Sequence, residues 1–153
     1  MPFSVHVDRT GQCLASDVRT ASSLWARFLG LMGRAALAPG EGLWFPGDTS
    51  IHMLFMRFPI DAVFLAPVTS DPATPAAEPS GDDAPDGWET PRRVRPLTRA
   101  PDRWRVVAIR PHLRPWTGVV WFVRGARGCL ELEAGAASAV NLRVGDIVSF
   151  ARQ

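Results

Sequence analysis

Residues 51–65, "IHMLFMRFPIDAVFL", form the apolar centre of the chain, and Arg57-Phe58-Pro59 divides them into two strand-like halves. In the first half, apolar side chains fall on both faces of an extended chain, which predicts a central strand buried on both sides. A strand would place His52 and Met56 about 13 Å apart, too far for one metal ion. The methionines are therefore expected to fill gaps in the core.

In the second half, Asp61 shares a strand face with Val63 and Leu65, so its carboxylate is expected to turn towards an apolar layer. A buried carboxylate needs a partner or it becomes neutral. The partner could be a backbone N–H in a turn or an arginine, with Arg27, Arg34 and Arg57 as candidates.

Short apolar runs separated by turn residues continue on both sides of this stretch, typical of a β-rich domain. Apolar residues at helical spacing, with Ser22 or Ser23 as a cap and Gly33 as a stop, predict one main helix over about 20–33. A short second helix is expected over about 135–140. We predict a single α+β domain over 1–153, predominantly β, with a small barrel-like or strongly curled sheet.

Residues 66–101 differ in composition from the rest of the chain, with eight of its 14 prolines. Such a segment cannot bury enough apolar surface to offset its chain entropy. It is predicted to be a flexible insertion that enlarges a hairpin connection. Its acidic first half and arginine-rich second half cancel much of each other's field, so no nucleic-acid contact is expected.

The composition excludes several functional classes. All 17 basic residues are arginine, so no lysine can act as a Schiff-base nucleophile, and the net charge is only +2. No secretory signal or transmembrane run is present, which predicts a cytoplasmic protein without a membrane partner. Cys13 and Cys129 are expected to be reduced, buried thiols, and neither belongs to a metal, cofactor or redox motif.

Four motifs follow one another along the chain: "RFLGLMGR" (27–34), "FMRFPID" (55–61), "LELEAG" (130–135) and "VGD" (144–146). In this order they resemble the domain-of-unknown-function family number 192, small proteins of bacteria and archaea. Relatives usually have proline at the position of Glu133 and a short turn in place of the insertion. The resemblance implies no reaction, because the family has no established activity.

Three functions are compatible with these patterns, and the sequence favours binding over catalysis. The first is a non-enzymatic binding module for a small anion or a peptide, with arginines to capture the anion. The second is a hydrolase-like or metal-assisted enzyme that uses Asp61 and Glu131. The third is an accessory protein that docks a partner through the arginine-rich insertion. The candidate site residues are Arg27, Arg34, Arg57, Asp61 and Glu131.

Overall fold

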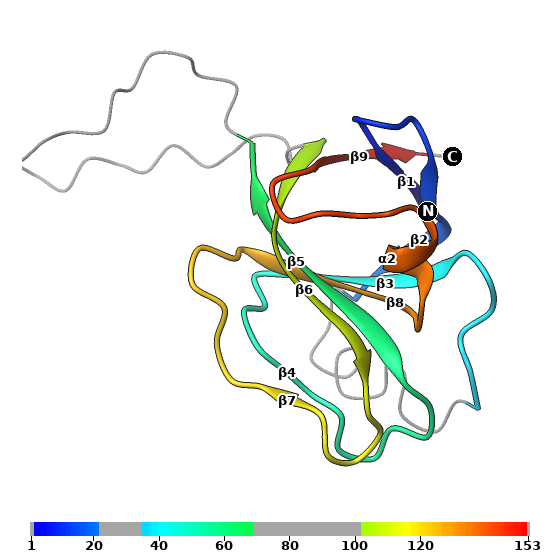
Figure 1. Ribbon diagram of the computed structural model, residues 1–153, viewed down its shortest axis with the longest axis vertical. Coiled ribbons are helices and arrows are strands. Elements are labelled where there is room, and N and C mark those ends of the chain that lie inside the picture. The colour runs from blue at the N-terminus through cyan, green and yellow to red at the C-terminus, as the bar shows by residue number, and fades with distance from the viewer. Residues whose placement is uncertain (1, 22–34, 69–101, 153) are drawn as a thin grey trace, which may run out of the picture.

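The computed structural model describes residues 2–21, 35–68 and 102–152, and in these residues the chain is built around a closed β-barrel (Figure 1). Neighbouring strands are antiparallel, except for the parallel pair β2 and β3. In order around the barrel the strands are β1 (Phe3–Val7), β2 (Cys13–Thr20), β3 (Glu41–Pro46), β8 (Gly128–Glu133), β5 (Ile60–Pro67), β6 (Arg103–Leu113) and β9 (Ile147–Arg152).

Two further elements lie outside the ring of strands. The short strands β4 (Ile51–His52) and β7 (Val119–Val120) pair as a separate antiparallel sheet. The helix α2 (Ala136–Ala139) follows β8 and lies against the end of the barrel (Figure 1). In the described segments, no helix has the length and apolar character needed to cross a lipid bilayer.

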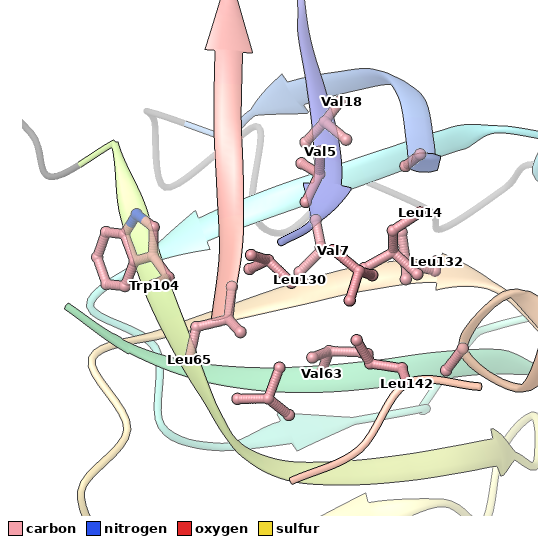
Figure 2. Packing of buried hydrophobic residues seen from close by; sticks show 14 of the residues in the cluster. Val5, Val7, Leu14, Val18, Val63, Leu65, Trp104, Leu130, Leu132 and Leu142 are labelled. Carbon is pink, nitrogen blue, oxygen red and sulfur yellow. The ribbon is translucent and has the colours of Figure 1, made fainter. Parts of the chain in front are cut away.

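The barrel interior is filled by the inward-facing side chains of alternate strand positions, as the period of a β-strand requires (Figure 2). Val63 and Leu65 of β5 lie opposite Leu130 and Gly128 of β8 and share their inner face. A Cβ atom at Gly128 would collide with the indole ring of Trp44, so glycine leaves the space that the tryptophan fills. The packing of this part of the core thus depends on the large side chain of Trp44 in β3 and on glycine at position 128 in β8.

The strand buried on both faces is β5, since every residue from Ile60 to Leu65 is buried. Its outer face is covered by an apolar layer that includes Phe64, Cys129 and Val123. The prediction of a two-sided core strand at 51–56 is wrong, because only Ile51 and His52 are extended and a turn comes next. Sequence periodicity could not separate these cases, because an apolar turn and a buried strand have the same composition.

The predicted predominantly β, barrel-like fold is confirmed, and so is the short helix expected at 135–140. Most of the main helix predicted at 20–33 lies outside the described residues, and Thr20 is the last residue of β2. The antiparallel pairing of β5 with β6 makes the strands around the insertion hairpin partners. Ala66 and Pro67, predicted as the first residues of the insertion at 66–101, belong to β5, and 69–101 lie outside the described residues.

Candidate functional site

Asp61 is fully buried at one end of the barrel and accepts hydrogen bonds from three backbone amides. Its Oδ1 accepts from the N–H of His112 at 2.9 Å, and its Oδ2 accepts from Gly135 at 3.0 Å and Ala137 at 3.1 Å. The carboxylate thereby joins β5 to the end of β6 and to the first turn of α2. Of the partners predicted for Asp61, the structure shows backbone donors and no described arginine.

Glu131 lies on the opposite face of the sheet from Asp61. Residues directly opposite one another in a ladder share a face. Asp61 pairs with Leu132, which points into the barrel, whereas Glu131 pairs with Ala62 and Leu43, whose side chains belong to the outer apolar layers. The two acids predicted for a hydrolase-like site therefore do not converge on one reacting atom.

The carboxyl group of Glu131 sits in an apolar, partly buried environment. Burial first, and then the negative charge of Asp48, raise its pKa to about 8. At neutral pH the group is therefore mainly protonated and can donate a hydrogen bond. No ion pair connects it to an arginine in the described segments.

The two cysteines are free thiols that differ in exposure. Burial, together with the charges of Glu131 and Asp48, raises the pKa of the Cys129 thiol well above its ordinary value, which disfavours the nucleophilic thiolate. Cys13 is exposed, so the prediction that both thiols are buried is wrong for Cys13. Within the described ranges, no three histidine, cysteine or acidic side chains gather closely enough to hold a metal ion.

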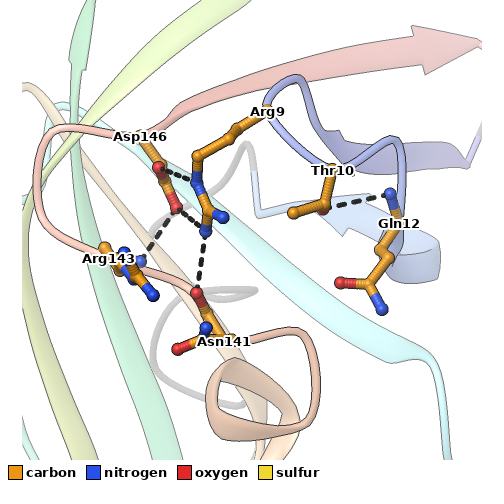
Figure 3. A network of polar contacts seen from close by, with 6 residues as sticks. All are labelled: Arg9, Thr10, Gln12, Asn141, Arg143 and Asp146. Carbon is orange, nitrogen blue, oxygen red and sulfur yellow. Dashed lines mark hydrogen bonds and ion pairs between the residues drawn. The ribbon is translucent and has the colours of Figure 1, made fainter.

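The motif that ends in Asp146 is structural (Figure 3). Arg9 binds Asp146 with two guanidinium nitrogens, at 2.8 and 3.0 Å, and also donates to the carbonyl of Asn141. The Arg143 amide donates to the same carboxylate, while Gly145 takes φ 95°. The hydrogen bond from Arg9 is the main cause of the lowered pKa of Asp146. The carboxylate is thus fully used in closing the turn before β9.

Arg57 is exposed, and Arg27 and Arg34 lie outside the described residues. Of the predicted group, only Arg57, Asp61 and Glu131 lie in the described residues, and no hydrogen bond or ion pair joins Arg57 to either acid there. Arg57 instead belongs to a surface that the sequence did not reveal.

That surface is formed by residues 49–59 and 114–127, which carry β4 and β7 and which we call the β4–β7 arm. The two segments lie side by side outside the barrel (Figure 1). One side of the arm packs on the barrel through buried Met53, Met56 and Phe58 and through Val123 and Ala126. The other side exposes large apolar side chains: Leu54 (46%), Phe55 (52%), Trp116 (54%), Val119 (40%), Trp121 (86%) and Phe122 (67%).

Two interlocked turns hold the tip of the arm. The Met53 amide donates to the carbonyl of Gly118, and the Met53 carbonyl accepts from Trp116, both at 2.8 Å. Phe55 and Trp116 have φ of 65° and 67°, a region that bulky side chains rarely adopt. Their rings meet edge to face, with centroids 5.4 Å apart. The backbone thus holds an exposed aromatic pair in a conformation that costs energy.

The arm is also positively charged. It contains Arg57, Arg114, Arg124 and Arg127 and no aspartate or glutamate. None of these four arginines forms an ion pair with an acid in the described part of the chain, whereas barrel arginines do, as in Arg103 with Asp8. A sequence scan could have found the absence of acids in 114–127, but the exposure of the aromatic residues depends on the fold.

Residues 5–74 match the family DUF192, described as Uncharacterized ACR. This segment is therefore similar to the DUF192 family. The resemblance predicted from the motifs is therefore confirmed over this range, which includes the first two motifs. No curated protein matches the chain.

Two solved structures share the fold of this chain. One is a proposed transcription regulator from Sinorhizobium meliloti 1021, with 20% identity, a TM-score of 0.62, and coverage of 97% of this chain and 91% of that chain. The other is a protein of unknown function from Novosphingobium aromaticivorans DSM 12444, with 19% identity, a TM-score of 0.62, and coverage of 97% and 84%. At this identity the similarity concerns the fold alone.

Proposed function

We propose that this protein is a non-enzymatic binding module, and that the β4–β7 arm is its binding surface. The observation that carries the proposal is the coincidence of six exposed large apolar side chains with four arginines that have no described acidic partner. Large exposed apolar patches on folded proteins commonly mark interaction sites.

The two components of the arm narrow the ligand class expected from the sequence, a small anion or a peptide. Guanidinium groups favour carboxylate or phosphate groups. The aromatic side chains favour an apolar body next to that charge. A ligand that combines both, such as an acidic peptide with apolar side chains, uses the whole surface, whereas a small inorganic anion uses only the arginines.

The enzymatic alternative has less support. Asp61 is saturated by three amides, and Glu131 projects from the other face of the sheet. A general acid or base must reach the reacting proton directly or through one water, which a fully buried, amide-bound carboxylate cannot do. Docking through the arginine-rich insertion concerns residues outside the described ranges and stays a separate prediction.

Calorimetric titration with three simple probes tests the binding role. Octyl phosphate carries an apolar chain and an anion, inorganic phosphate carries only the anion, and octyl glucoside carries only the chain. Below its critical micelle concentration, octyl phosphate is expected to bind more tightly than either of the others. Replacing Arg57 and Arg124 by glutamine is expected to weaken this binding about two- to thirtyfold, because exposed ion pairs contribute roughly 0.2–1 kcal/mol each.

The matched control is Arg105→Gln, which removes an exposed charge from β6, outside the arm. It should leave octyl phosphate binding unchanged. Equal affinity of the arm variant and the wild type would show that the arm is not the binding surface.

A further inference from the structure

The aromatic residues of the arm stand at two places on its exposed side. Phe55 and Trp116 occupy the turns at the tip, and Trp121 and Phe122 come directly after the two-residue strand β7. Trp121, with 86% of its surface exposed, is the most exposed large apolar side chain in the described part of the chain. These side chains therefore offer separate apolar groups on turns and at a strand end.

Each aromatic group has arginines close to it in the chain. Arg57 and Arg114 each stand two residues from an aromatic side chain of the tip, and Arg124 stands two residues after Phe122. With four arginines and no acid, the arm carries a charge of +4, although the whole chain carries only +2. The remainder of the chain, summed together, is net negative by two charges, and the charge of the arm favours an anionic surface.

Resting on the binding role proposed for the arm, we propose that its partner is an anionic membrane surface, bound peripherally. Tryptophan and phenylalanine favour the boundary between headgroups and acyl chains, where an aromatic ring can be buried from water. Arginines beside them are attracted to anionic headgroups. Both places on the arm combine aromatic and cationic side chains, as binding to the acyl-chain boundary and to anionic headgroups requires.

A fluid lipid surface fits the arm better than a rigid partner does. A stable protein interface usually buries about 800 Å² on each partner and needs matching shapes. Aromatic groups on separate turns can enter a lipid interface without a complementary cavity. A second copy of this chain is disfavoured at the same surface, because two arms of charge +4 repel each other.

The buried side of the arm supports the same arrangement. Met53, Met56, Phe58, Val123 and Ala126 fix the arm on the barrel, and the hydrogen bonds of Met53 fix its tip. The backbone that carries the exposed aromatic residues is therefore held in place before binding, which reduces the entropy cost of docking. The sequence analysis expected no membrane partner, because it found no transmembrane run. This proposal departs from that expectation, because the exposure of the aromatic residues becomes visible only in the structure.

Co-sedimentation with lipid vesicles tests the proposal on the full-length chain. We expect binding to vesicles of phosphatidylcholine mixed with phosphatidylserine, and much weaker binding to phosphatidylcholine alone. Binding should fall as salt is added, because the Debye length shortens to about 8 Å at 0.15 M ionic strength. Replacing both Arg57 and Arg124 by glutamine should weaken binding about 25-fold, since each arginine near an anionic surface contributes roughly fivefold.

A second variant, Trp121→Ser combined with Phe122→Ser, should weaken vesicle binding at least about tenfold while thermal unfolding stays near that of the wild type, because both side chains are exposed. The matched controls are Val144→Ser, which removes an exposed apolar side chain outside the arm, and Arg105→Gln. Both controls should bind vesicles like the wild type.

Failure of this proposal can be distinguished from failure of the binding role. If the wild type binds octyl phosphate or an acidic aromatic peptide through the arm, but not phosphatidylserine vesicles, the membrane proposal is wrong and the binding module stands. Arm-dependent binding of a single-stranded oligonucleotide in preference to vesicles would also overturn it. If the arm variants bind every probe as the wild type does, both proposals are wrong.

Discussion

At the scale of single residues, Asp61 is a structural anchor that resembles a catalytic acid in the sequence. Its buried carboxylate accepts three amide hydrogen bonds, from His112, Gly135 and Ala137. Asp61→Ala leaves these donors without a partner and is expected to destabilise the fold by about 3–5 kcal/mol. Asp61→Asn keeps the volume and one acceptor oxygen, so a smaller loss of about 1–3 kcal/mol is expected.

Urea denaturation of the two variants measures these losses. An Asp61→Ala protein as stable as the wild type would show that the amide contacts do not stabilise the fold. The structural assignment of Asp61 would then be wrong.

Glu131 is expected to make stability depend on pH. Its pKa is about 8 in the folded chain against an ordinary 4.5, so between these values the folded state holds more protons than the unfolded state. Stability therefore declines as pH rises through this window, by on the order of 4 kcal/mol for this group alone. Glu131→Gln cannot ionise, so the variant should match the wild type at about pH 4 and exceed its stability at about pH 9.

The measurement is the free energy of unfolding of both proteins at a series of pH values. The difference between them isolates residue 131 from the other titrating groups. A difference that stays constant across the window would mean that the Glu131 carboxyl is well solvated in the folded chain.

At the scale of elements, the packing of β3 against β8 depends on the complementarity of Trp44 and Gly128. A methyl group at position 128 would overlap the indole ring, so Gly128→Ala is expected to cost about 1–3 kcal/mol through overpacking. Trp44→Leu on its own should destabilise the barrel by removing an aromatic side chain that contacts Trp104 and Phe150.

A double-mutant cycle checks this contact. In the double variant the added methyl group occupies space that the indole has left, so its cost should be smaller than in the wild-type background. Additive losses would show that the collision at Gly128 is relieved elsewhere in the barrel.

At the scale of the whole molecule, the sequence predicted the features that depend on local pattern. Alternation placed Asp61 on the face of Val63 and Leu65, and that face does point into the barrel. The short helix after "LELEAG" also forms as expected. Each of these features is set by neighbouring residues, so the local sequence contains the information.

The β4–β7 arm was harder to predict, because its position depends on which face of the barrel sheet is covered by further apolar residues. Residues 53–56 look like a core strand, yet Met53 and Met56 pack inwards from a turn while Leu54 and Phe55 remain in solvent. Glu131 alternates with Leu130 and Leu132, a pattern typical of an ordinary half-buried strand. Its pKa is raised only because apolar residues cover the outer face of β8. Periodicity alone predicts neither of these two facts.

The proposed function of the whole molecule depends on the β4–β7 arm being its binding surface. A map of backbone amide chemical shifts during titration with octyl phosphate, below its critical micelle concentration, locates that surface residue by residue. We expect the largest changes within 49–59 and 114–127, with inorganic phosphate giving smaller changes at the arginines alone. Changes centred on Asp61 or Glu131, with the arm unaffected, would contradict the assignment of the arm.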